Sequence, residues 1–248
     1  MADQDDAGRA GAEFLWGLRE RPVKQPRLAL TVDRIATAAI EMADAEGIEG
    51  VSMQRVAASL DVTKMALYRH LTNKAELVAV MIEMAVGDPP DLSAIEGGWR
   101  PRIEHWAELM RGTWRRHPWL PTATVGDRAI GPREIGWTES ALSAFDGTPL
   151  LGAEKIDAVF VLSGHIRNSQ VAALSGTQPW TSDRRTRGDI GELMRRNHNQ
   201  FPHILAALDD ARNAPADNSW AFGLEQILRG LASLIDERAT TKPLRRAK

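Results

Sequence analysis

Apolar residues recur along this chain at the spacing of helix faces. From residue 32 to residue 43 they fall three and four positions apart, which forms one apolar stripe: Val32, Ile35, Ala36, Ala39, Ile40 and Ala43. Thr31 is suited to cap the start of this helix, and Gly47 is suited to end it. Because no alternating run is long enough for a sheet, the pattern predicts an all-α protein.

Shorter helices are predicted next, with Ser52 and Asn73 as caps: residues 52–60, 63–70 and 73–86. Only the tripeptide Leu60-Asp61-Val62 separates the first two. Helices of under three turns bury too little surface to stand alone, so these two must pack against the long helix that precedes them. Two short helices joined by a tight turn and supported by a third predict a helix-turn-helix.

The stretch GDPPDLSAIEGG, residues 87–98, is rich in helix breakers and predicts a hinge. Beyond it the pattern is helical again: one helix ending at His117-Pro118, and others over residues 132–145, 153–174, 189–211 (interrupted near Pro202) and 219–237, with a polar loop over 177–188. The sequence therefore predicts four parts: a flexible arm (1–30), a helix-turn-helix DNA-binding domain (31–86), the hinge (87–98) and a larger helical domain (99–248).

The second short helix has the chemistry that a DNA duplex requires. From Val62 to Ala75 there is no acidic residue. Thr63, Lys64 and Met65 stand at the leading end, where a recognition helix reads base edges. Lysine can donate to guanine, and an apolar group can meet a thymine methyl. Tyr68, the only tyrosine, and Lys74 are placed for phosphate oxygens.

A plainer interpretation of the same helix is a solvated face with a few basic residues. The arm offers a similar choice. It carries Arg19, Arg21, Lys24 and Arg27, which could reach a minor groove, or it is a disordered solubilising tail.

The segments GIEGVSMQRVAASLDV and ALYRHLTNKAELV, within residues 32–86, resemble the N-terminal domain of the TetR family of repressors. Farther along, RRHPWL, FPHILAAL and WAFGLEQILRGLASLI are similar to the C-terminal domain of the tetracycline-repressor type. The resemblance implies a ligand-responsive repressor that binds a palindromic operator.

By position, the resemblance implies DNA contacts from one residue of the first short helix and from several on and after the second: Gln54, Thr63, Lys64, Met65, Tyr68, His70 and Lys74. Asp61 stands where the turn usually holds glycine. Aspartate tolerates left-handed backbone better than most residues, so we expect the turn to form.

The resemblance also implies a homodimer through a four-helix bundle, for which residues 153–174 and 219–237 are the best suited helices. It implies a pocket for a small effector, which we expect to be hydrophobic, aromatic or polyketide-like. The residues proposed to line it are Trp106, Met110, Trp114, Trp137, Phe160, His165 and Asn168. The alternative is that these side chains are core. We expect the effector to move the hinge and the helix before it, changing the separation of the two recognition helices.

Composition and the absence of certain motifs argue against other classes of protein. The chain of 248 residues has no cysteine and a net charge of −2, and no long apolar run or basic leader, so we expect a cytoplasmic protein without membrane contact. Nucleotide-binding and hydrolase motifs are absent, and the six histidines have no ligand spacing, so we expect no enzyme activity, no cofactor and no metal. An effector-independent dimeric DNA-binding protein remains the main alternative, with an all-helical enzyme behind it.

Overall fold

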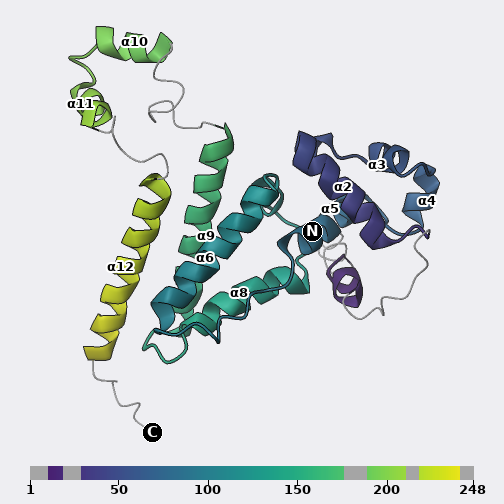
Figure 1. Cartoon of the computed structure of the whole chain (residues 1–248), viewed down its shortest axis with the longest axis horizontal. Coiled ribbons are helices and arrows are strands. Elements are labelled where there is room, and N and C mark those ends of the chain that lie inside the picture. The colour runs from purple at the N-terminus through teal and green to yellow at the C-terminus, as the bar shows by residue number, and fades with distance from the viewer. Residues whose placement is uncertain (1–10, 19–28, 176–188, 211–217, 241–248) are drawn as a thin grey trace. The chain divides into compact units, whose positions relative to one another are not determined.

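The computed structural model describes residues 11–18, 29–175, 189–210 and 218–240, and its regular elements there are all helical, as predicted (Figure 1). The chain divides into two compact units, Met1–Thr148 and Pro149–Lys248, which we describe separately. No helix within these described ranges is long and apolar enough to cross a membrane.

The first unit begins its helical bundle with the predicted helix-turn-helix. Its helices are α2 (Val32–Glu46), α3 (Met53–Ser59), α4 (Lys64–Tyr68) and α5 (Lys74–Val86). Thr31, Ser52, Thr63 and Asn73 occupy the N-cap positions, and each side-chain oxygen accepts a backbone N–H three residues ahead. Polar caps satisfy N–H groups that have no partner within the helix, which is why these residues set the helix starts.

The turn between α3 and α4 depends on Asp61. Its φ is 54°, and it is the only non-glycine residue with positive φ among the described residues. Ala57 accepts the N–H of Val62 at 3.0 Å across the turn. The expectation that aspartate would adopt the left-handed conformation here is confirmed. Val56, Leu67 and Leu71 are buried, whereas Leu60 and Val62 are only partly covered.

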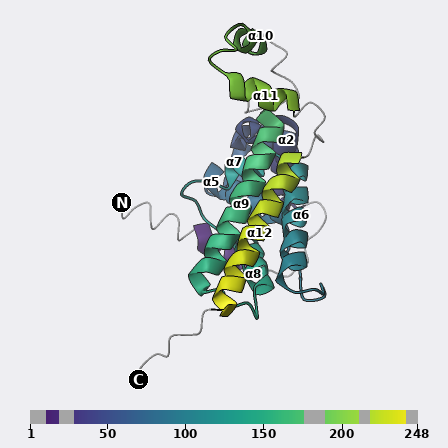
Figure 2. The ribbon, with the colours of Figure 1, turned by 90° about the vertical axis from the view of Figure 1, so that its left-hand side faces the viewer.

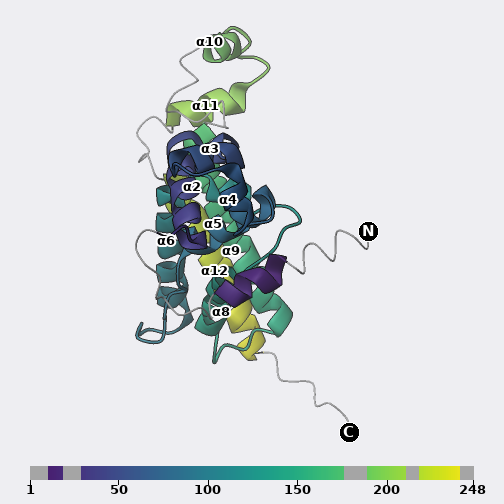
Figure 3. The ribbon, with the colours of Figure 1, turned by 90° about the vertical axis from the view of Figure 1, so that its right-hand side faces the viewer.

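The first unit continues with α6 (Trp99–Arg116), the short α7 (Leu120–Ala123) and α8 (Pro132–Ala144). α5 contacts α2, α6, α7 and α8, so it is the central helix of this unit. Its buried residues come from nearly all its faces: Leu77, Ala79, Val80, Met81, Ile82, Glu83 and Ala85. Around it, α3 and α4 face the viewer in Figure 3.

Three short elements were not predicted: the turn of 3-10 helix η1 (Ile48–Gly50), α7, and a helix over residues 11–18. In that last helix Leu15 is buried, so this part of the predicted flexible arm is ordered and packed. The basic residues of the arm, Arg19, Arg21, Lys24 and Arg27, lie outside the described residues, as does the predicted loop over 177–188.

The second unit contains α9 (Gly152–Ser175), α10 (Asp189–Arg196), α11 (Pro202–Asp210) and α12 (Asn218–Thr240). α9 and α12 run side by side (Figure 2). Near the start of α9, Glu154 accepts a hydrogen bond from Arg238 Nε at 2.9 Å, near the end of α12. His165 lies farther along α9 and contacts Trp220 at the start of α12. These two links make the pair antiparallel.

Candidate nucleic-acid interface

Helix α4 presents one face to solvent and one to the core. Lys64, Met65, Tyr68 and Arg69 are exposed, while Leu67 between them is fully buried. Met65 is 70% exposed, which for a large apolar side chain at the start of a helix has no packing explanation. The helix is therefore anchored by its leucine and leaves its other side chains open to a partner.

Two local contacts hold the leading end of α4. Thr63 is exposed and accepts the N–H of Ala66 at 3.3 Å as the N-cap. The Lys64 ammonium lies 5.6 Å from the centre of the Tyr68 ring, a cation–π contact. This contact holds the lysine and the tyrosine together on the exposed face, so a positive charge and a hydroxyl are presented as one group.

Two further predicted contacts flank α4. Gln54 is exposed on α3, and Lys74 is exposed as the first residue of α5. His70 differs from the prediction because it is half-buried, so it presents less of its ring than the other predicted residues. Arg69 is exposed and basic on the same helix, and it belongs with this surface although the predicted set omitted it.

The nearest carboxylate beyond α4, Glu76, is already engaged. Its side chain accepts the N–H of Thr72, while its own N–H donates to the Asn73 side chain at 2.9 Å. The two hydrogen bonds close the N-terminus of α5 in a variant of the capping box, in which the carboxylate reaches the residue before the N-cap. The acidic group therefore stabilises the helix start.

Arg55 secures α3 to the end of α2. It donates to both carboxylate oxygens of Glu46, at 2.7 and 2.8 Å, and to the carbonyl of Gly50 at 2.7 Å. The hydrogen bonds from Arg55, followed by its positive charge, lower the pKa of Glu46. Sequence reasoning missed this pair because its members lie nine residues apart and on different elements.

A second carboxylate on α2 reaches the corner between α6 and α7. Asp44 accepts a hydrogen bond from His117 Nδ1 at 2.9 Å and from Trp119 Nε1 at 2.8 Å. α2 is thereby tied to the RRHPWL segment.

A third carboxylate joins α5 to α8. Glu83 is buried, and it accepts the backbone N–H groups of Arg133 at 2.9 Å and Glu134 at 3.2 Å. Burial raises the pKa of Glu83, and the two backbone hydrogen bonds oppose that shift. A single acidic residue inside the apolar run VMIEMAV was the signal in the sequence that could have identified it.

Four of the residues proposed for the effector pocket lie in the first unit. Trp106 is fully buried, and its Nε1 donates to the carbonyl of Trp137 at 2.9 Å. Trp137 in turn donates through Nε1 to the carbonyl of Val86 at 3.2 Å. Trp114 is buried and Met110 half-buried. The structure thus brings Trp106 and Trp137 together, with both indole N–H groups satisfied by backbone.

The other three lie on α9 in the second unit and do not form a cluster. Phe160 is 76% exposed, and Asn168 is also exposed. His165 is half-buried and stacks on Trp220. Within their own unit, Phe160 and Asn168 point to solvent, whereas His165 is used in packing.

Capped short helices around a left-handed turn, with an exposed basic and apolar face on the second, define a helix-turn-helix DNA-binding protein. Residues 29–81 match the family described as bacterial regulatory proteins of the tetR family, and residues 90–235 match the tetracyclin repressor-like C-terminal domain. The chain belongs to the TetR family of transcriptional regulators.

Similar proteins agree with this assignment. The chain is 32% identical to the HTH-type transcriptional repressor DrrR1 of Streptomyces coeruleorubidus, over 96% of this chain and 95% of that protein. Among solved structures, apo ActR of Streptomyces coelicolor superposes with a TM-score of 0.70 at 21% identity, covering 84% of this chain and 98% of ActR. A TetR variant of Acinetobacter baumannii in complex with minocycline gives 0.63 at 17% identity, covering 88% and 100%.

Proposed function

We propose that two copies of this chain bind a palindromic operator as a repressor and that a small hydrophobic or aromatic effector releases it. The observation that carries the DNA part is the exposure of Met65 at the leading end of a helix whose other face is buried. In this proposal Thr63, Lys64 and Met65 meet base edges, with Gln54 and His70 beside them. Tyr68 and Lys74 meet phosphates.

The dimer part rests on the second unit. Large apolar side chains are exposed on both long helices: Ile156, Phe160 and Val161 on α9, and Phe222 on α12. Ile156 and Phe160 are four residues apart and therefore share one face of α9, and exposed apolar surface of this kind marks interaction sites in soluble proteins. A two-fold axis through such a face gives a four-helix bundle with α9 and α12 from each copy.

Support for the effector comes from similar proteins. ActR is described in complex with actinorhodin, at a TM-score of 0.66 and 22% identity, and the A. baumannii TetR variant with minocycline. We propose that the corresponding helical domain of this chain, residues 99–248, takes a ligand of similar size. On binding, it changes the separation of the recognition helices from the spacing of about 34–36 Å that successive major grooves require.

One observation favours the alternative of an effector-independent dimer. Trp106 and Trp137, proposed for the pocket, have the contacts expected of core residues: both are buried and both indole N–H groups donate to backbone. Under that alternative the larger domain serves dimerisation only.

Selection of DNA from a random pool with the full chain tests the first part of the proposal. We expect a palindromic consensus, confirmed by gel shift; recovery of no consensus would refute operator binding. Minocycline and actinorhodin are then titrated into the complex while tryptophan fluorescence is followed. We expect at least one to quench the fluorescence and release the DNA. Unchanged fluorescence and unchanged gel shift with both would favour the effector-independent dimer.

A further inference from the structure

Glu83 is a buried carboxylate in a place that needs an explanation. It lies on α5 between apolar neighbours and is 7% exposed. Burying a charge is unfavourable unless it is hydrogen-bonded. Its two acceptor contacts are the N–H groups of Arg133 and Glu134, in the first turn of α8. The carboxylate therefore caps a helix to which it does not belong.

Helix α8 has no cap of its own. Gly131 occupies the N-cap position, where no side chain is available, and Pro132 follows it. A Cβ built on Gly131 would lie 2.2 Å from the Glu83 carboxyl carbon. The φ of Gly131 is −98°, which any residue can adopt. Glycine is thus required for the space that Glu83 occupies, and its conformational freedom is not needed.

Further contacts between α8 and the residues just after α5 follow along α8. Arg133 Nε donates to Asp88 at 2.9 Å, and Ser140 Oγ donates to the carbonyl of Pro90 at 2.6 Å. A Cβ on Gly136 would lie 2.9 Å from Pro89. Successive turns of α8 are therefore joined to the end of α5 and to the first residues of the predicted hinge.

We infer that Glu83 is a positioning residue for operator binding, through which the first turn of α8 holds α5 in the orientation that α4 needs on DNA. The inference rests on the proposed function. α5 follows the recognition helix directly and packs against α2, so any change in α5 reaches the helix-turn-helix. Residues 87–90 are then held against α8 by the contacts described above. A movement of α8 is transmitted to α5 through the Glu83 carboxylate.

The test separates capping from positioning with two variants of the full chain. Glu83→Ala removes both the cap on α8 and the link between α8 and α5. Glu83→Ala combined with Gly131→Ser restores a cap on α8 itself, because serine is a preferred N-cap residue and the extended backbone at residue 131 suits it. The serine Cβ fits only once Glu83 is truncated. Glu139→Ala, an exposed residue of the same helix, is the control.

Three measurements are compared: the melting temperature, the affinity for the selected operator, and hydrogen exchange of the amides over residues 78–86. For Glu83→Ala we expect a lower melting temperature, an operator affinity reduced roughly threefold or more, and faster exchange in α5. The double variant should recover the melting temperature while affinity and exchange stay changed. Glu139→Ala should match the wild type.

Recovery of affinity and of α5 protection in the double variant would overturn the inference, because Glu83 would then only stabilise the start of α8. If Glu83→Ala does not fold, Glu83→Gln, which loses one acceptor oxygen, is compared with the wild type by exchange and affinity. Failure of the wild type to select any DNA would refute the proposed function. The exchange measurement would still decide whether α8 holds α5 through Glu83.

Discussion

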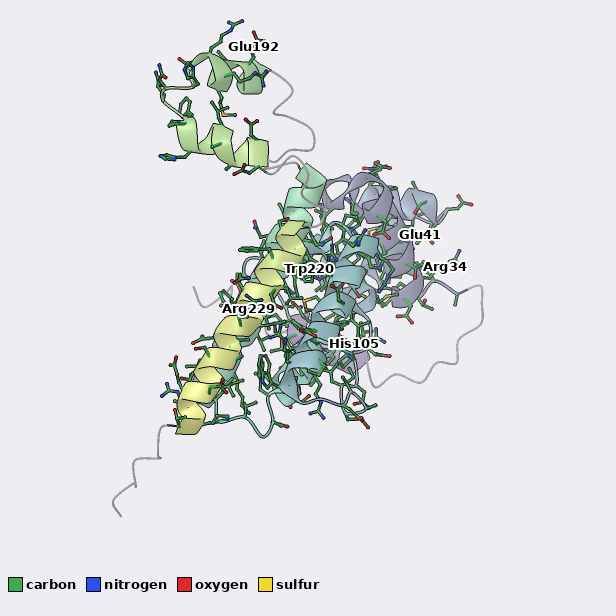
Figure 4. The ribbon with its side chains drawn as sticks, turned by 60° about the vertical axis from the view of Figure 1, so that its left-hand side comes forward. Arg34, Glu41, His105, Glu192, Trp220 and Arg229 are labelled. Carbon is green, nitrogen blue, oxygen red and sulfur yellow. The ribbon has the colours of Figure 1, made fainter. Side chains whose placement is uncertain are left out.

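His165 of α9 lies face to face with Trp220 of α12, with ring centroids 5.2 Å apart and 5° between the ring planes. As the Nε2–H tautomer it donates to the Trp220 carbonyl at 3.1 Å. Figure 4 labels Trp220 on α12. Gly223, one turn farther, leaves the room that the imidazole fills. A histidine proposed for an effector is thus engaged in joining two helices.

Gly223→Ala should lower stability. The new Cβ would lie 2.1 Å from His165 Cε1, so the stacked ring must move. Overpacking of this kind destabilises by about 1–3 kcal/mol, which exceeds the gain of about 0.5–1 kcal/mol from alanine in a helix. Thermal unfolding followed by circular dichroism measures the effect. Gly112→Ala on α6, where the nearest atom is an arginine side-chain nitrogen 3.9 Å away, is the control and should stabilise.

The turn residue Asp61 gives a second prediction. With φ at 54° it adopts a conformation that L-residues disfavour, and aspartate tolerates it better than alanine. Asp61→Ala should therefore destabilise by about 1 kcal/mol, whereas Asp61→Gly should leave stability unchanged or raise it. Chemical denaturation of the three proteins decides this. Equal stability of the alanine and glycine variants would mean that the turn relaxes out of the left-handed region.

The helix-turn-helix could be predicted from sequence because its signals are local. Thr31, Ser52 and Asn73 cap their helices by hydrogen bonds to residues three positions ahead. Asp61 likewise responds to its own backbone geometry. Hydrophobic periodicity then identifies the buried face of each helix. The residues of α4 that are not on its buried face could therefore be predicted to be exposed.

The remaining features depend on contacts between elements distant in sequence. Glu83 and Gly131 stand 48 positions apart by their numbers in the chain, and neither residue alone indicates the other. Phe160 and His165 share one helix, yet one is exposed and the other is packed on α12. Periodicity could not distinguish them, because α9 is apolar on more than one face. The pocket residues were for this reason the weakest part of the sequence prediction.

The ion pair between Glu46 and Arg55 predicts a pH dependence. The pKa of Glu46 is lowered in the folded protein from its ordinary value of 4.5. The stabilisation is therefore present above 4.5 and is lost as the pH falls through the folded-state pKa. The melting temperature of the wild type should exceed that of Glu46→Gln at neutral pH, and this difference should shrink below pH 4.5. A difference that stays constant with pH would contradict the pairing in solution.

Lys74→Ala should weaken operator binding without affecting the fold. The lysine is exposed at the first residue of α5, where removing a positive charge does not harm the helix. Loss of one phosphate contact should reduce the slope of log affinity against log salt by about one and act equally on all sequences. Arg195→Ala, an exposed residue of α10 in the second unit, is the control and should not change the slope. A loss confined to one base pair would mean that Lys74 reads a base.

Phe160→Asp should dissociate the proposed dimer. Phe160 is 76% exposed on α9 in the single chain, and in the proposed dimer it is covered by the second copy. Burying a phenylalanine contributes about 1.5–3 kcal/mol. In a two-fold interface each substitution occurs twice, and an unpaired carboxylate is unfavourable in an apolar interface. We expect light scattering to give a monomer at concentrations where the wild type is a dimer. Gel shift should then show weak binding to the full palindrome.

The control is Val125→Asp, a 54% exposed apolar position in the first unit, which should remain dimeric. Dimeric Phe160→Asp with full operator affinity would place the interface on another face.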